Sequence, residues 1–203
     1  MNFSGSFSCV VLGAWIGGSA CVWGFVTYNF LGYEDLFARN PKLAARAEFD
    51  PADSEAKKTS LLWVHSSELN RVVFEYWNLA QMGLAAVALI ALLLARLGVT
   101  VWLCVLLAGG LVIYGHFSLM PEIVALGRGL DFVPRSPPPE ELGAFGAAHG
   151  KYLVVAGLTF ALVLTAAALA LRGRHGISLR RPRASPILSN GASGGPGRNP
   201  VTG

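Results

Sequence analysis

Charged side chains are scarce in this sequence of 203 residues. Asp, Glu, Lys and Arg make up only 14% of the chain, whereas 53% is hydrophobic and the mean hydropathy is +0.51. Soluble domains carry about 25% charged residues. A shortage of this size excludes an ordinary soluble domain and indicates that lipid is the main solvent of the chain.

Cysteine is also rare, and the motifs of common catalytic and metal chemistry are missing. The three cysteines, Cys9, Cys21 and Cys104, lie in apolar runs, and none forms a Cys-x-x-Cys pair. Cysteines in such runs usually behave as small, buried hydrophobic side chains. The sequence has no His-x-x-x-His or His-Glu-x-x-His, and its Gly-rich stretch 143–150 lacks the Lys-Ser/Thr pair of a phosphate-binding loop. It therefore favours a protein that is not an enzyme, although it leaves the question open.

Long apolar runs are what the sequence has instead. A helix of about 20 apolar residues, rising about 1.5 Å per residue, crosses the hydrocarbon core of a bilayer. We therefore predict an all-α integral membrane protein, a four-helix bundle over residues 1–172 with a flexible basic tail over 173–203. The predicted spans are about residues 7–30, 72–95, 99–119 and 152–171.

The connections between these spans differ in length. The short stretch Arg96-Leu97-Gly98 predicts an antiparallel hairpin between the second and third spans. Helical spacing of apolar residues over 60–71 predicts one helix that runs into the second span. We predict a second large loop over 121–150, in which residues 140–149 form a short surface helix before the last span.

Basic residues follow the last span closely and predict the orientation of the chain. Arginines next to a span mark the cytoplasmic side and contact lipid headgroups, and they do not indicate nucleic-acid binding here. Arg96 in the short hairpin lies on the same side. We therefore predict a bacterial inner-membrane protein with cytoplasmic termini. The arginines after the last span are Arg172, Arg174, Arg180, Arg181 and Arg183.

Small residues form a stripe along the first span. Gly13 and Gly17 are spaced as Gly-x-x-x-Gly, and Gly24 extends the stripe. Small residues allow a neighbouring helix to approach closely, so we predict packing there. The alternative, that small residues are simply common in membrane spans, stays open.

Polar side chains gather at one membrane face in this topology, because the first and third spans end where the second and fourth begin. Ionisable groups within spans suggest function, but Glu75 is equally compatible with an interfacial position. His116 and His149 come from neighbouring spans, and imidazole is a common ligand of haem iron and copper. Alternatively, His116 is an interfacial histidine hydrogen-bonded to a carbonyl or to Glu75, and His149 only helps to end the loop before the last span. The residues at this face are His65, Glu75, Asn78, His116, Glu122 and His149.

Two short motifs carry a family resemblance. The first is Ala14-Trp15-Ile16-Gly17-Gly18 in the first span. The second begins at Pro121-Glu122-Ile123 and ends with Phe145 and His149-Gly150. With these motifs the chain resembles the transmembrane-protein-205-like branch of the copper-resistance-D-like membrane proteins.

The resemblance implies a four-helix membrane architecture. Its superfamily also includes a haem-dependent protoporphyrinogen oxidase and copper-transfer proteins, whose first span typically carries a histidine before the tryptophan-glycine motif. Residues 7–12 contain no histidine here, which counts against carrying over haem binding.

Two main functional hypotheses follow from the sequence. The first is a multi-pass membrane protein without catalytic centre, either an accessory subunit that contacts other membrane subunits or a small-molecule handling protein. The alternative is a haem- or copper-binding redox or transfer protein that uses His116 and His149. A transporter is a third hypothesis, and its polar path would be formed by Glu75, Asn78, Gln81 and His116.

Overall fold

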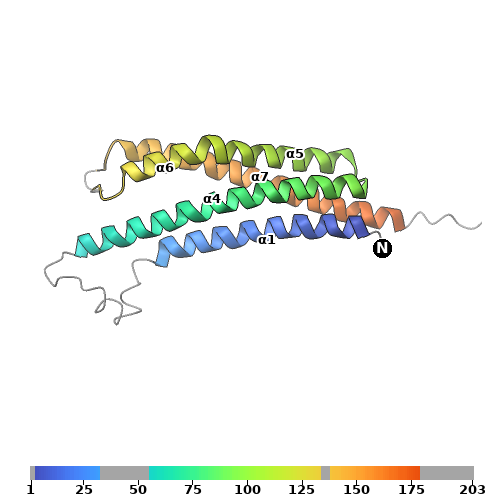
Figure 1. Ribbon diagram of the computed structural model, residues 1–203, viewed down its shortest axis with the longest axis horizontal. Helices are drawn as coiled ribbons and strands as arrows, with labels where there is room; N and C mark the ends of the chain where they lie inside the picture. The colour runs from blue at the N-terminus through green and yellow to red at the C-terminus, as the bar shows by residue number, and fades with distance from the viewer. Residues whose placement is uncertain (1–2, 33–54, 134–137, 179–203) are drawn as a thin grey trace, which may run out of the picture.

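The computed structural model describes residues 3–32, 55–133 and 138–178, and every regular element in those ranges is a helix (Figure 1). The all-α prediction is therefore confirmed. Of the predicted tail over 173–203, residues 173–178 form the end of α7, and the rest lies outside the described residues, as does the stretch 33–54 between the first two spans. The elements are α1 (Phe3–Gly32), α4 (Glu55–Ala95), α5 (Val99–Tyr114), the π-helix η1 (Gly115–Leu119), α6 (Met120–Gly129) and α7 (Glu141–Ser178).

Within the described residues, four helical stretches are long and apolar enough to cross a membrane. They are 29 to 36 residues long, whereas about 20 residues suffice to cross the hydrocarbon core. The prediction of a four-span integral membrane bundle is confirmed. The stretches are Ser4–Gly32, Ser60–Ala95, Val99–Gly129 and Glu141–Arg172.

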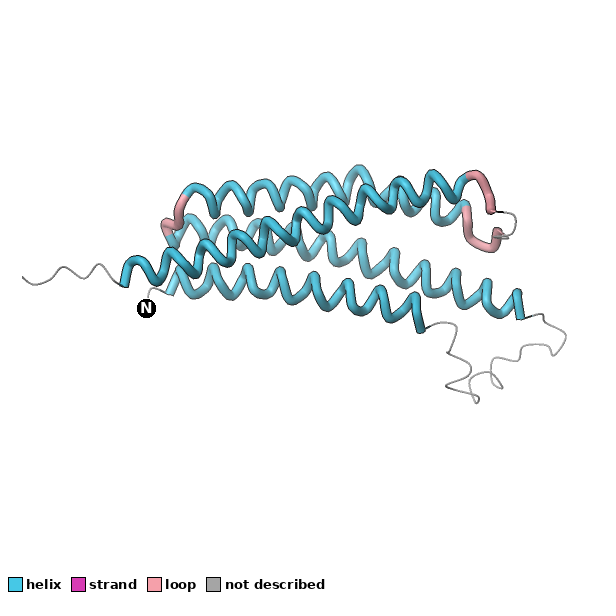
Figure 2. The backbone as a smooth tube through the Cα atoms, turned by 180° about the vertical axis from the view of Figure 1, so that it is seen from behind, coloured by secondary structure: helices cyan, strands magenta, loops and turns pink. Residues whose placement is uncertain are grey.

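The four helical stretches run side by side in alternating directions (Figures 1 and 2). At one end, α4 and α5 are joined by residues 96–98, as the predicted hairpin requires, and α1 begins there. We call this the hairpin end. At the other end, α1 and α6 finish and α4 and α7 begin, and we call it the loop end.

Two helices are longer than their spans. The predicted helix over 60–71 is confirmed, because α4 runs without a break from Glu55 to Ala95. The segment over 140–149 is also helical, but it is the first part of α7 and not a separate helix. Both α4 and α7 therefore begin at the loop end, well before their predicted spans.

The predicted loop over 121–150 is wrong in its first part, where α6 continues the third helical stretch. Pro121 occupies the first turn of α6, and because it has no N–H it cannot donate to a carbonyl of the preceding helical turn. The turn before it is a π-helix, in which the Met120 N–H donates to the Gly115 carbonyl. With this wide turn the helix continues through Pro121, where the sequence predicted the start of a loop.

The core of the bundle combines a few large side chains with small ones. Trp15 and Leu12 of α1 are fully buried, and so are Leu92 and Val105 of the hairpin helices. Alanines at the same level let the backbones approach closely, which favours helix association in lipid. The buried alanines of this part of the core are Ala85, Ala88, Ala91, Ala108, Ala166 and Ala170, and Ala148 is buried nearer the start of α7.

The glycines of α1 fall into two groups. A Cβ added at Gly13, Gly17 or Gly24 would meet no atom of the described chain within 4 Å. Their packing role stays a prediction, and it would concern a neighbour outside this chain. Gly18 is different, because a Cβ there would overlap the indole ring of Trp77 on α4. Gly18 is thus where α1 approaches α4 most tightly among these four.

We predict that Gly18→Ala lowers the melting temperature of the protein in detergent, because the Trp77 ring must shift to admit a methyl group. Gly17→Ala is the matched control and should leave the melting temperature nearly unchanged. Thermal unfolding followed by tryptophan fluorescence or circular dichroism measures both. A larger loss in Gly17→Ala than in Gly18→Ala would contradict this packing.

Candidate functional site

A chain of buried hydrogen bonds ties three helices together inside the bundle. The Trp15 indole N–H donates to Gln81 Oε1 at 2.9 Å, and Gln81 Nε2 donates to Asn78 Oδ1 at 3.4 Å. The Tyr152 hydroxyl of α7 donates to the same Asn78 oxygen at 3.1 Å. All four residues are buried. Because hydrocarbon offers no partners, these bonds fix how α1, α4 and α7 face one another.

Three polar residues recur at every third position of α4, and only two of them take part in these hydrogen bonds. Asn78 and Gln81 are buried, whereas Glu75 is exposed. A step of three residues turns an α-helix by about 300°, so each member lags the previous one by about 60°. This lag brings the later two residues into the interior and leaves Glu75 on the outer surface.

A cavity of about 180 Å³ lies towards the loop end, between α1, α4, α6 and α7. Its walls are mainly aromatic and aliphatic, and they include Phe30, Trp63, Phe74, Phe145 and Tyr152. A few polar side chains interrupt them. The polar lining residues are Ser67, Asn70, Arg71, Asp131 and His149.

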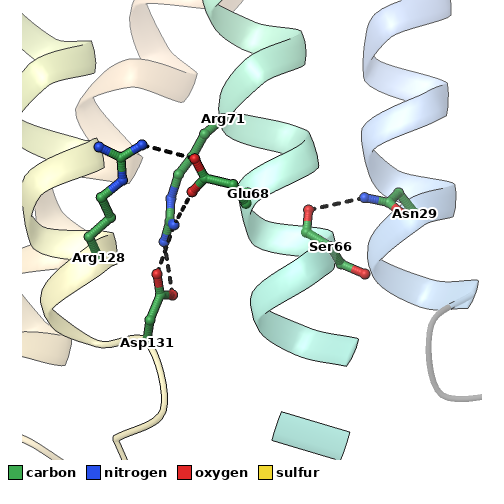
Figure 3. A network of polar contacts seen from close by, with 6 residues as sticks. All are labelled: Asn29, Ser66, Glu68, Arg71, Arg128 and Asp131. Carbon is green, nitrogen blue, oxygen red and sulfur yellow. Dashed lines mark hydrogen bonds and ion pairs between the residues drawn. The ribbon is translucent and has the colours of Figure 1, made fainter. Parts of the chain in front are cut away.

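Ion pairs balance the charge at the wall of this cavity (Figure 3). Arg71 of α4 holds both carboxylate oxygens of Asp131, at 2.8 and 3.0 Å, and contacts Glu68 at 2.7 Å. Arg128 of α6 contacts the other Glu68 oxygen at 2.8 Å. Two cations and two carboxylates therefore cancel, and the wall is polar without net charge.

A pair of asparagines stands beside this network. Asn29 of α1 donates from Nδ2 to the Ser66 carbonyl at 3.1 Å and to Asn70 Oδ1 at 2.9 Å. Asn70 is only 3% exposed, and its Nδ2 has no hydrogen-bond partner among the described residues. Within the described part of the chain, this amide donor and Asn78 Nδ2 are therefore both buried without an acceptor.

A second hollow, of about 450 Å³, lies between α1 and α7. It shares Phe30, Phe74, His149 and Tyr152 with the first cavity. On α1 it extends back to Trp23, about 10 Å nearer the bilayer centre than Phe30 at the helical rise. We call it the α1/α7 groove. Its remaining lining residues are Val26, Thr27, Leu31, Leu153 and Ala156.

The residues predicted at this membrane face differ in their surroundings. His149 lines both hollows, and its ring stacks on Phe145 with centroids 5.7 Å apart. His65 and Glu122 are exposed. His116 lies in η1 against Phe117, and it lines neither hollow. Its Nδ1 is buried without a hydrogen-bond partner in the described part of the chain.

The metal ligands predicted from the sequence are His116 and His149. Over the described ranges, no three His, Cys, Asp or Glu side chains gather as a metal site would require. The hypothesis that His116 and His149 share a haem or a copper ion stays a prediction.

Several residues of the site were missed by the sequence interpretation. Arg71 and Asp131 are 60 positions apart, and no local pattern pairs them. Asn70 and Tyr152 looked like ordinary residues at the start of a span. The one available signal was Asn29, an amide near the end of an otherwise apolar run, where a buried partner is required.

Comparison with family models, with curated proteins and with solved structures gives no match for this chain. The resemblance to transmembrane-protein-205-like proteins therefore stays a prediction. The geometry of the site is therefore the basis of the proposed function.

We predict that Asp131→Asn destabilises the loop end, because it leaves the Arg71 guanidinium, whose side chain is 12% exposed, without its bidentate partner. The cost should be roughly 2 kcal/mol, below that of a fully buried pair. Arg128→Gln is the matched control, since its side chain is 61% exposed and such pairs contribute less than about 1 kcal/mol. Denaturation of the two variants in detergent measures the difference, and equal losses would contradict it.

Proposed function

We propose that this chain is a non-enzymatic multi-pass membrane protein that binds a small amphipathic molecule in the cavity at the loop end. The observation that carries the proposal is an aromatic cavity with a few polar groups, continuous in its lining with a groove between two spans. Small-molecule sites typically have this composition, and they lie between the helices of bundles.

The position of the two hollows supports a ligand that arrives from the bilayer. The cavity lies at the level of Arg71, near the start of the span, and the α1/α7 groove continues towards the bilayer centre. An amphipathic molecule places its polar head near the interface and its apolar part in the hydrocarbon. The shape of the combined hollow matches that distribution.

The finer form of the proposal is an accessory role in a membrane complex. Glu75 is exposed about one helical turn deeper than Arg71, whereas ionisable groups in spans usually face protein or water. Gly13, Gly17 and Gly24 also face outwards. Other membrane subunits would cover these surfaces.

The orientation of the chain places the cavity in one leaflet. With cytoplasmic termini, as the arginines favour, the cavity belongs to the leaflet opposite the cytoplasm.

Photolabelling tests the proposal. A dodecanol that bears a diazirine in its tail should label residues around the cavity, such as Phe145 and Trp63, when the full chain is irradiated in detergent. Excess unlabelled dodecanol should suppress this labelling because the site is saturable. Mass spectrometry of the digested protein maps the label.

Two tryptophan variants provide the control for this experiment. Val124→Trp fills the cavity, whose wall includes Val124, and should reduce the labelling several-fold. Leu93→Trp places the same ring on an exposed position of α4 and should not. Labelling that is spread over the outer surface and is equal in both variants would contradict a cavity ligand.

The second candidate function is haem or copper binding by His116 and His149. The specific observation in its favour is the buried Nδ1 of His116, which lacks a partner among the described residues, since imidazole nitrogen is a common metal ligand.

If this candidate function holds, protein purified from metal-replete cells should show a Soret band or stoichiometric copper. His116→Ala and His149→Ala should each remove it, because each substitution takes away one ligand. A colourless, metal-free preparation from such cells would exclude the candidate.

A further inference from the structure

We propose that two copies of this chain form a two-fold symmetric dimer in the membrane through the outer face of α5, in which Glu75 of each copy pairs with Lys151 of the other. The inference rests on the finer form of the proposed function, in which membrane subunits cover Glu75, and it names a second copy as the partner. It does not depend on ligand binding in the cavity.

Glu75 and Lys151 are charged residues without a partner inside the bundle. Both are exposed, and neither forms an ion pair or a hydrogen bond among the described residues. Glu75 lies 20 residues before Ala95, and Lys151 lies 20 residues before Leu171. Since about 20 residues cross the hydrocarbon core, both charges lie at its edge nearest the loop end. An ionised group in or at the core gains from a partner of opposite charge.

The two charges lie at the same depth in the membrane. The ring of Tyr152 contacts the ring of Phe74, with centroids 5.6 Å apart. These two residues are the chain neighbours of Lys151 and Glu75. A second copy that stands upright in the same bilayer therefore holds its Lys151 at the level of Glu75.

Glu75 lies on the α6 side of α4. It follows Glu68 by seven residues, close to two full helical turns. Glu68 pairs with Arg128 of α6 at 2.8 Å (Figure 3). The side of α4 that carries both carboxylates is therefore turned towards the helical stretch that α5, η1 and α6 form.

Lys151 lies on the other flank of the same stretch. It precedes Val155 by four residues, about one helical turn. Val155 faces η1, because a Cβ added at Gly115 would meet its Cγ1 at 3.8 Å. The third helical stretch is thus bordered by a carboxylate on its α4 side and by an ammonium group on its α7 side.

This arrangement is complementary to itself under a two-fold axis along the membrane normal. When two copies face each other through α5, the left border of one stands opposite the right border of the other. In a two-fold interface residue i contacts residue j, and j contacts i. Each Glu75 therefore meets the partner's Lys151, and two ion pairs form. Opposite charges across an interface also fix its register.

The surface between the two charges is apolar and open. Gly110 is exposed at its middle, and a Cβ added there would meet no atom of the described chain within 4 Å. A glycine at this place allows the α5 helices of two copies to approach closely. We call this surface the α5 face. Around Gly110 it consists of the exposed side chains of Leu103, Leu106, Leu107, Ile113, Tyr114 and Phe117.

Förster transfer between copies tests the dimer. The full chain, labelled at its C-terminus with a donor or an acceptor, is reconstituted into phosphatidylcholine vesicles and diluted with lipid. The unmodified chain should show transfer well above that of random encounters. Glu75→Lys and Lys151→Glu should each raise the dissociation constant at least about tenfold, because each turns two attractive contacts into repulsive ones.

Mixing the two variants gives the most specific test. A donor-labelled Glu75→Lys chain and an acceptor-labelled Lys151→Glu chain carry opposite charges at both contacts, so the mixture should restore the transfer that each variant loses alone. A folding defect would not be restored in this way. Tyr28→Lys is the matched control and should leave the transfer unchanged. Its position is exposed on α1, which lies across the bundle from α5 (Figure 1).

Cross-linking at the α5 face tests the same dimer without changing a charge. Gly110→Cys, in a chain whose native cysteines are replaced by alanine, should form a disulfide-linked dimer when the vesicles are oxidised with copper phenanthroline. Gly17→Cys, on the outer side of α1, is the control and should stay monomeric.

The outcomes separate this inference from the proposed function. Transfer at the random level overturns the dimer, and so does equal transfer in the unmodified chain and all variants, since the copies would then meet elsewhere. If the chain alone is monomeric and a photo-cross-linker at position 75 captures another protein in cell membranes, the inference fails and the finer proposed function stands. If the cross-linker captures only lipid, both fail. Photolabelling of the cavity is unaffected in each case.

Discussion

A polar atom between the spans is costly unless it finds a partner within the protein, because the surrounding hydrocarbon offers none. The hydrogen bonds from Trp15 to Gln81 and from Tyr152 to Asn78 meet this requirement across three helices. They also set the rotation of α4 about its own axis. Asn70 lies eleven residues before Gln81, close to three full turns, so the same rotation turns Asn70 inwards. The deep hydrogen bonds and the polar wall of the cavity are thus consequences of one helix orientation.

The character of the bundle changes along its length. Near the hairpin end the interior is filled by alanines and a few large side chains, whereas the loop end holds aromatic rings, ion pairs and a hollow. Close packing at one end stabilises the bundle and leaves the other end free to be less completely filled. The ion pairs hold α4 against the end of α6 without filling the space beside them. A binding cavity is therefore compatible with a stable membrane bundle.

Much of the fold could be predicted from the sequence, because hydropathy and helical period are local signals. The four spans, the hairpin at residues 96–98 and the helix that extends the second span all follow from such signals. The site could be predicted only in part. The inward turn of Asn78, in contrast to Glu75, depends on helix rotation, and the pairing of Arg71 with Asp131 depends on how distant segments meet. The continuation of the helix through Pro121 depends on the π-turn before it, for which the sequence offers no comparable pattern.

That π-turn has a consequence for how the protein can vary. A π-turn amounts to one additional residue in an α-helix, and the wide turn absorbs it. Loss of a single codon within Gly115–Leu119 would therefore restore an uninterrupted α-helix and leave α6 with the same face towards the bundle. Met120, Ile123 and Gly127, which line the cavity, would stay in its wall. Descendants of this chain could thus differ by one residue in length at this position and keep the same cavity lining.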